Sequence, residues 1–231
     1  MADVGVASRR VSATGDGRGV GSAGGVGVGA WVCVDGVEGT GKTTVAARLA
    51  RELDADQAPE FSAAVFGRAL CSVVATTPHH ISTSPVGQSL VFLGDFFEVH
   101  ATAVAPRLRQ GRTVVSDRGY LSKYTYQEVV LAAEIGADAA RALLGPVFAC
   151  LPPPDLTVRL VAPTPCLRER LLRRDGHCDP AREGFIDRAV RAADEFLRRT
   201  PGMAVATIAA DRSVDEVVAD AVAAVRAIRH S

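Results

Sequence analysis

The 231-residue sequence predicts a three-layer α/β fold, in which a parallel sheet is flanked by helices on both faces. Three observations predict it. Apolar runs of strand length alternate with helical stretches, a glycine-rich turn directly follows the first apolar run, and another apolar run ends in an aspartate. In open parallel sheets, ligands bind at the carboxyl ends of the strands. We therefore expect one domain of this kind, with its site at that edge of the sheet.

The expected elements follow one another as strand and helix. Apolar runs predict strands over residues 30–35, 113–117, 156–161 and 203–208. Apolar residues at helical spacing predict helices over 43–53, 89–108, 124–144, 166–174, 185–199 and 215–228. Residues 56–88 contain Pro59, Pro78 and Pro85 and show no clear strand pattern.

Residues 1–29 are expected to form a flexible, glycine-rich tail that precedes a domain over 30–231. This segment holds nine of the 22 glycines and no aromatic residue, so it cannot bury enough apolar surface to offset its ordering entropy. A G-x-G-x-x-G pattern at 19–24 is not a dinucleotide site, because no strand precedes it and the glycines after it disfavour a helix.

Composition excludes several functional classes. The formal net charge is zero, which disfavours binding to nucleic acid or to an anionic membrane surface, and no apolar run is long enough to span a membrane. The five cysteines are scattered, and Cys166, His177 and Cys178 lack a fourth metal ligand. Free thiols and the absence of a secretory signal pattern predict a cytoplasmic protein.

The most specific motif is a phosphate-binding loop. Residues Gly36, Val37, Glu38, Gly39, Thr40, Gly41, Lys42 and Thr43 fit G-x-x-x-x-G-K-[ST], between an expected strand and an expected helix. The loop's backbone N–H groups can cradle a polyphosphate, a solvent-facing Lys42 can reach the β- and γ-phosphates, and the Thr43 hydroxyl can hold Mg²⁺. Lys42 is one of only two lysines, against 24 arginines. The motif predicts binding of a nucleoside triphosphate.

A second motif runs from Asp117 to Gln127. An apolar strand that ends in Asp117 matches the arrangement in which a carboxylate organises Mg²⁺, and Arg118 next to it can direct a planar fork at a phosphate. An ion pair between neighbouring Asp and Arg residues that caps the strand is the alternative reading.

The two motifs together resemble the thymidylate kinase family. V-D-G-V-E-G-T-G-K-T-T (34–44) and D-R-G-Y-L-S-K-Y-T-Y-Q (117–127) are similar to that family's E-G-x-[DE]-G-[AS]-G-K-[ST]-T and D-R-[YH]-x-x-S-x-x-A-Y-Q. Weaker similarity extends the match to about residues 30–228, and the Glu38-Gly39 pair is similar to the bacterial branch, in which a lid supplies arginines. The resemblance implies a P-loop kinase fold with a five-stranded parallel sheet, ATP and Mg²⁺ as cofactors, a nucleoside monophosphate as substrate, and a homodimer.

The resemblance also implies roles for single residues. On the donor side, Lys42, Thr43 and Thr44 would handle the phosphates and Mg²⁺. The residues that would contact the acceptor are Glu38 at the sugar 3′-hydroxyl, Glu60 by a loose correspondence, Phe92 on the base, Asp117 near the metal, Arg118 on the phosphate, and Ser122, Lys123 and Tyr126 around the sugar and base.

The base-reading part of the chain departs from the family. Phe96 stands where the family has an arginine for a thymine carbonyl, Lys123 replaces a small polar residue, and Gly119 replaces a tyrosine or histidine. Only Glu60 remains of the family's R-E-P-G-G-T segment. A base that does not fit a pocket leaves buried hydrogen-bond donors and acceptors of that pocket unpaired, so such a pocket discriminates strongly between bases. Because these donors differ from those of the family, we expect the protein to prefer another pyrimidine monophosphate over dTMP.

A lid is expected at about residues 166–184. Arg170, Arg173 and Arg174 fall on one helical face, and Gly176 can end the helix. Arginines presented by a lid can neutralise charge on the transferring phosphoryl group, so Arg170 and Arg174 join Lys42 and Arg118 as expected catalytic residues. A solvated arginine face is the alternative.

The sequence thus favours phosphoryl transfer from ATP to a nucleoside 5′-monophosphate. Two alternatives stay open: a (deoxy)nucleoside kinase, in which Glu38 or Glu60 serves as base, and a nucleotide-binding module without catalysis. Arg118 favours an acceptor that carries a phosphate, and the chain lacks the N-K-x-D signature of guanine-binding switches.

Overall fold

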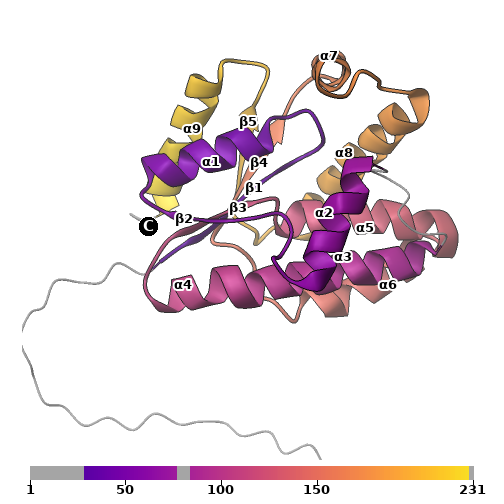
Figure 1. Ribbon diagram of the computed structural model, residues 1–231, viewed down its shortest axis with the longest axis horizontal. Coiled ribbons are helices and arrows are strands. Elements are labelled where there is room, and N and C mark those ends of the chain that lie inside the picture. The colour runs from indigo at the N-terminus through magenta and orange to yellow at the C-terminus, as the bar shows by residue number, and fades with distance from the viewer. Residues whose placement is uncertain (1–28, 77–83, 229–231) are drawn as a thin grey trace, which may run out of the picture.

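The protein has three layers, a parallel sheet between two sets of helices (Figure 1). The computed structural model describes residues 29–76 and 84–228. Its five strands are β1 (Trp31–Gly36), β2 (Asp56–Ala58), β3 (Val114–Asp117), β4 (Leu156–Val161) and β5 (Val205–Ala209). They lie in the order β2-β3-β1-β4-β5, and every pair is parallel. The expected fold class is therefore confirmed.

Alternate residues of β1 explain why both faces of the sheet need helices. Trp31 and Cys33 belong to one core cluster, and Val32 and Val34 belong to the other, so the strand is buried on both sides. Helices α1 (Lys42–Glu52) and α9 (Val214–Ile228) cover the Val32 face. Helices α3 (Pro85–Val99), α5 (Tyr120–Ile135) and α6 (Ala137–Phe148) cover the Trp31 face.

The remaining helices are α2 (Val65–Thr76), a π-helical turn η1 (His100–Val104), α4 (Ala105–Arg109), α7 (Thr164–Asp175) and α8 (Pro180–Arg199). Among the described residues, every helix is too short or too polar to cross a membrane. The cytoplasmic location stays a prediction.

Several elements differ from the sequence-based expectation. The short β2 lies in a region where no strand pattern was clear, because three residues are too few to show a period. The expected helix over 89–108 begins earlier, at Pro85 after the N-cap Ser84, and is interrupted by η1. Pro106 in the next turn has no N–H to donate, which favours the local change in helical winding.

The expected helix over 124–144 is two helices. Gly136, with a φ of 82°, separates α5 from α6, and most residues avoid this backbone conformation. The tail expected over residues 1–29 lies almost entirely outside the described residues.

Candidate active site

The phosphate-binding loop joins the carboxyl end of β1 to the N-terminus of α1. Gly36 and Gly41 both have a positive φ, of 149° and 86°. At Gly36, a Cβ would also lie 2.5 Å from the carbonyl oxygen of Leu160 on the neighbouring strand β4, so only glycine fits. The strand, loop and helix are in the arrangement that the motif requires.

Lys42 is the first residue of α1 and is buried, whereas a solvent-facing charge was expected. Its Nζ donates a hydrogen bond to the carbonyl oxygen of Val37, at 2.7 Å. Burial lowers the pKa of Lys42, and the nearby charge of Arg118 lowers it further, to about 7. The lysine side chain therefore folds back on the backbone of the phosphate-binding loop.

Asp117 ends β3 next to the phosphate-binding loop. In the parallel register, it pairs with Val34 of β1. Its Oδ1 is buried and has no hydrogen-bond partner within the described part of the chain. Burial raises the pKa of Asp117, and a hydrogen bond from the Thr43 hydroxyl partly offsets this. A hydroxyl and a carboxylate oxygen that lie together fit a hard, oxygen-preferring cation such as Mg²⁺.

Arg118 follows in a strained backbone conformation. Its φ of 65° is unfavourable for a residue with a side chain, while its N–H still bonds to the carbonyl oxygen of Val34. The Arg118 guanidinium forms an ion pair with Glu60, with 2.7 Å between Nε and Oε1, and lies 5.1 Å from the centre of the Tyr126 ring. The Arg118 side chain is half-buried and lines the small cavity beside the loop.

Lys123 lies one turn into α5 and is also buried. Its Nζ is 3.3 Å from the carbonyl oxygen of Glu60 and 4.7 Å and 5.9 Å from the ring centres of Phe61 and Phe92. Burial lowers the pKa of Lys123 although the Glu60 carboxylate opposes the shift. The pKa of Glu60 is lowered because Arg118, Lys123 and Lys42 together outweigh its own burial.

These side chains line one small cavity of about 60 Å³. It brings together seven of the eight residues expected at the acceptor: Glu38, Glu60, Phe92, Arg118, Ser122, Lys123 and Tyr126. Asp117 is not in its lining. Small-molecule sites usually measure roughly 300 Å³ or more, so this cavity must widen to admit a nucleotide.

The sequence analysis missed Gln127 and Asp35. Gln127 lines the cavity, and its Oε1 is buried without a hydrogen-bond partner among the described residues. Asp35 accepts hydrogen bonds from the backbone N–H groups of Gly119 and Ser122, at 2.9 and 3.2 Å, and so holds the N-terminus of α5 against β1. Asp35 lies inside the first sequence motif, at 34–44, and Gln127 inside the second, at 117–127. Their place in these motifs was the signal that could have identified them.

Two departures from the family have a structural reason. A Cβ at Gly119 would lie 2.2 Å from Sγ of Cys33, so the cysteine in β1 excludes a larger residue there. Phe96 was expected to face the base, and this expectation is wrong: its ring packs in the core, 6.5 Å from that of Trp31 and 5.9 Å from that of Phe148. Lys123 alone remains as an altered base-pocket residue.

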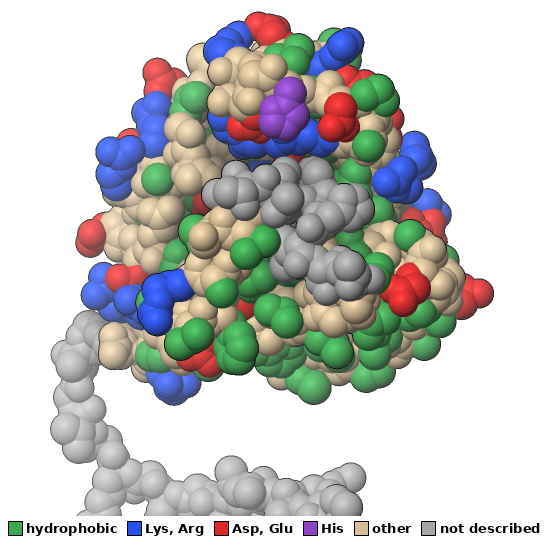
Figure 2. Space-filling model, turned by 45° about the vertical axis from the view of Figure 1, so that its right-hand side comes forward, with side chains coloured by type: hydrophobic (Ala, Val, Ile, Leu, Met, Phe, Trp, Pro, Cys, Tyr) green, Lys and Arg blue, Asp and Glu red, His purple; other side chains and the backbone are tan. Residues whose placement is uncertain are grey.

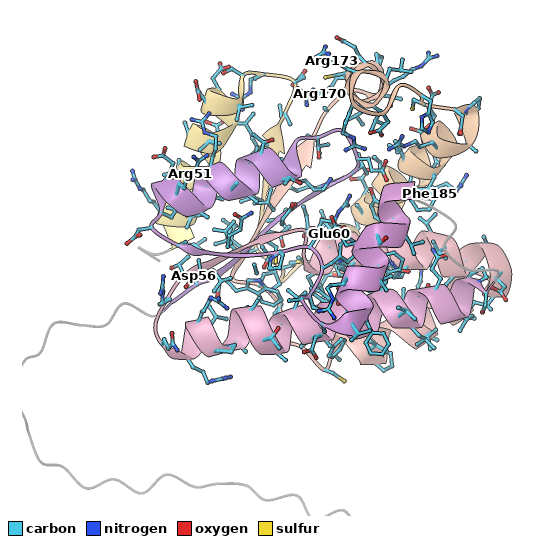
Figure 3. The ribbon with its side chains drawn as sticks, in the orientation of Figure 1. Arg51, Asp56, Glu60, Arg170, Arg173 and Phe185 are labelled. Atoms are coloured by element: carbon cyan, nitrogen blue, oxygen red, sulfur yellow. The ribbon has the colours of Figure 1, made fainter. Side chains whose placement is uncertain are left out.

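The segment expected to act as a lid comprises α7, a turn at Gly176 and the start of α8. Arg170 donates to the carbonyl oxygens of Gly39, at 3.2 Å, and Ala210, at 2.7 Å, and so reaches the phosphate-binding loop (Figure 3). Arg174 instead forms two hydrogen bonds with Asp175, and Arg173 pairs with Glu169 of its own helix. Of these three arginines, Arg170 is the one in contact with the loop, and the catalytic roles of Arg170 and Arg174 stay predictions.

A further lid arginine was not foreseen. Arg182 in the first turn of α8 pairs with Glu38 of the phosphate-binding loop, 144 residues away in sequence. Both side chains are buried.

Comparison with known proteins agrees with this site. The thymidylate kinase family model matches residues 34–221, which include the phosphate-binding loop, the residues that line the small cavity and the expected lid. The chain belongs to the thymidylate kinase family. As a member, it is a nucleoside-monophosphate kinase, a transferase that moves a phosphoryl group to an acceptor phosphate, and the alternatives without this activity are not favoured.

Individual relatives span most of the chain. It is 30% identical to a thymidylate kinase of Prochlorococcus marinus, over 82% of this chain and 90% of that protein. It is 29% identical to a probable thymidylate kinase of Pyrobaculum aerophilum, over 83% of this chain and 93% of that protein. The crystal structure of thymidylate kinase from Ehrlichia chaffeensis shares the fold, with a TM-score of 0.64 and 16% identity over 85% of this chain and 98% of that one.

Proposed function

We propose that the chain transfers the γ-phosphoryl group of ATP to dTMP or a closely related pyrimidine deoxynucleotide, with Mg²⁺. The observation that carries this proposal is the position of Arg118, a half-buried cation that lines the acceptor cavity directly beside the phosphate-binding loop. A monophosphate would offer this guanidinium a second anion besides the Glu60 carboxylate, whereas a nucleoside without a phosphate would offer none.

On the donor side, the loop backbone and Lys42 would hold the phosphates of ATP. Thr43 and Asp117 would hold Mg²⁺, which supplies charge neutralisation on the β- and γ-phosphates when it is bound. The unpartnered Oδ1 of Asp117 supports this assignment.

On the acceptor side, Arg118 would bind the 5′-phosphate, whose own oxygen is the nucleophile. No protein base is required, because a phosphate dianion needs no deprotonation, so the contribution of these residues is positioning and electrostatic stabilisation. Tyr126, Lys123 and Gln127 line the rest of the cavity and are proposed to contact the sugar and base.

The test is ADP release from ATP with a panel of acceptors, namely dTMP, dUMP, dCMP, dAMP and thymidine, with Mg²⁺ or with excess chelator. We expect turnover with at least one pyrimidine monophosphate, none with thymidine, and loss of turnover with the chelator. Phosphorylation of thymidine at a rate similar to that of the monophosphates would contradict the proposal.

We also propose that two copies pair through α2 and α3. Val65 and Phe66 on α2 are 70% and 66% exposed, and Leu90 and Val91 on α3 are 51% and 41% exposed. Apolar side chains also gather in the lower part of the face seen in Figure 2, while charges of both signs cover its upper part. Light scattering of the wild-type protein should give the mass of a dimer, and that of Phe66→Glu should give the mass of a monomer. A wild-type protein that stays monomeric at high concentration would exclude the pairing.

A further inference from the structure

Arg182 and Glu38 form the most buried ion pair that joins the lid to the phosphate-binding loop in the described part of the chain. Nε and Nη2 of Arg182 lie 2.9 and 2.6 Å from the same oxygen of Glu38, Oε2. The two side chains are only 5% and 10% exposed. Because a buried charge without its partner is strongly destabilised, each residue depends on the other for its position.

The pair continues into the lid. Nη2 of Arg182 is also 2.8 Å from Asp175 at the end of α7, and Asp175 accepts two hydrogen bonds from Arg174. Hydrogen bonds from Arg174, followed by those from Arg182, lower the pKa of Asp175 to about 2, so this carboxylate stays ionised at any working pH. The Arg182 side chain thus links the start of α8 to Asp175 at the end of α7 and to Glu38 of the phosphate-binding loop.

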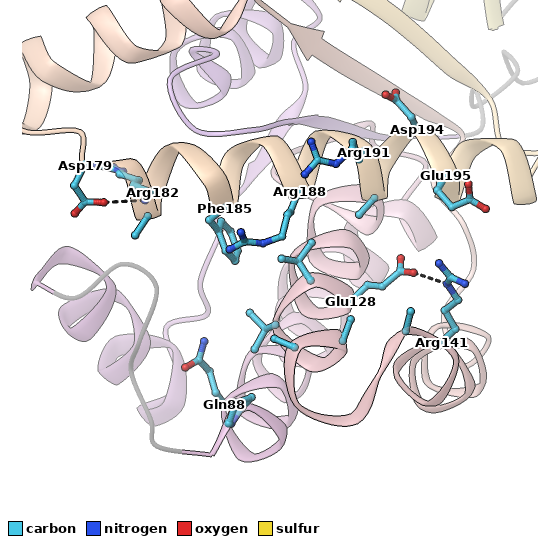
Figure 4. A pocket seen from close by; sticks show the side chains of 18 of the residues that line it. Gln88, Glu128, Arg141, Asp179, Arg182, Phe185, Arg188, Arg191, Asp194 and Glu195 are labelled. Carbon is cyan, nitrogen blue, oxygen red and sulfur yellow. Dashed lines mark hydrogen bonds and ion pairs between the residues drawn. The ribbon is translucent and has the colours of Figure 1, made fainter.

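The pair also stands between two cavities. Glu38 lines the small acceptor cavity, and Arg182 lines a groove of about 1210 Å³ beside α8 (Figure 4). Gln88, Val130 and Phe185 line both spaces.

We propose that Arg182 is a positioning residue for phosphoryl transfer, which fixes the Glu38 carboxylate at the acceptor cavity and so makes lid closure and acceptor binding one coupled event. This inference rests on the proposed function, since it assigns Glu38 to the acceptor side. Arg182 itself faces the carboxylate rather than the loop backbone, so its effect on the acceptor passes through Glu38.

Kinetics of single and double variants test the coupling. Arg182→Gln should raise KM for dTMP, or for the pyrimidine monophosphate that the panel identifies as the acceptor, by about tenfold or more, the cost of losing a hydrogen bond to a charged group. In Arg182→Gln, the KM for ATP should change by less than about twofold. Arg182→Lys, which keeps the charge but not the two-donor contact, should lie between wild type and Arg182→Gln.

The double variant Glu38→Gln with Arg182→Gln should be no worse than the worse single variant, because the two residues act as one unit. Arg198→Gln is the matched control: Arg198 is an exposed arginine on the same helix that pairs with Glu195 one turn away. The proposal would be overturned if the effects of the two substitutions on the KM for the acceptor multiplied in the double variant. It would also be overturned if the KM for ATP rose as much as the KM for the acceptor.

A second readout needs no turnover. In the unliganded protein, Glu38→Gln should speed hydrogen exchange of the lid amides at residues 176–179 by about tenfold or more, whereas Arg198→Gln should leave it as in wild type. Unchanged exchange in Glu38→Gln would overturn the link between lid and loop. If no acceptor in the panel were phosphorylated, the proposed function would fail while this exchange experiment could still be read.

Discussion

The burial of Lys42 predicts that ATP binding takes up a proton at mildly alkaline pH. In the free protein the pKa of Lys42 is about 7, because its ammonium is desolvated and close to Arg118. The phosphates of ATP bring several negative charges to this ammonium, which favours its protonated form and returns the pKa toward the ordinary lysine value of roughly 10.4. Lys42 must therefore gain a proton when ATP binds between these two pKa values.

The size and sign of the effect follow from these two values. At pH 8, roughly a tenth of Lys42 is protonated in the free protein and nearly all of it in the complex, so binding takes up about 0.9 proton. Since protons are taken up on binding, the affinity for ATP falls as pH rises, by about tenfold per pH unit between roughly pH 8 and pH 9.5. Below about pH 6 the dependence becomes small, because about nine-tenths or more of Lys42 is then protonated in the free protein as well as in the complex.

Calorimetry measures this uptake directly. The apparent enthalpy of binding of ATP with Mg²⁺ is compared at pH 8 in HEPES and in Tris, and the difference divided by the difference in buffer ionisation enthalpy gives the number of protons. Lys42→Arg is the control, because an arginine keeps its charge at every working pH and the uptake should disappear. An enthalpy that does not depend on the buffer for the wild type would refute the reasoning and show that Lys42 is charged in the free loop.

Three further predictions concern the acceptor site and the tail. Arg118→Lys should weaken monophosphate binding and preserve ATP affinity, because the planar fork is lost; equal loss of both in titrations would place Arg118 on the donor side. Lys123→Asn should shift competition between pyrimidine monophosphates toward dTMP, and a wild type already about tenfold selective for dTMP would contradict this role. Removal of residues 1–28 should leave the melting temperature and turnover nearly unchanged, and a drop of several degrees would show that the tail packs on the domain.

Features coded by neighbouring residues could be predicted from the sequence. The apolar run of β1 and the glycines after it identify the loop, and the run that ends in Asp117 identifies the second ligand-bearing strand. Parallel pairing then places both carboxyl ends at one edge, as the register of Val34 with Asp117 shows. The acceptor residues on α5 followed from the resemblance of the second motif to the thymidylate kinase family.

Features that depend on tertiary packing could not be predicted. The pairing of Glu38 with Arg182 joins residues 144 positions apart, and nothing in the local sequence distinguishes Arg182 from 23 other arginines. Phe96 lies one helical turn after Phe92 but faces the core, because Trp31 and Phe148 surround its ring. The resemblance to the family placed Phe96 at the base, but in the structure its ring packs in the core.

The neighbours of each cation in the site explain why the pKa values of these cations differ. Arg118 and Arg182 each pair with a glutamate, the half-buried Glu60 and the buried Glu38, and both keep their charge. Lys42 donates its hydrogen bond to the carbonyl oxygen of Val37, and burial and the charge of Arg118 lower its pKa to about 7 although Glu60, Asp117 and Glu38 oppose the shift. The motif assigns Lys42 to the ATP phosphates. A polyphosphate would therefore bring its negative charge to an ammonium that burial disfavours, which is why ATP binding is expected to restore the charge of Lys42.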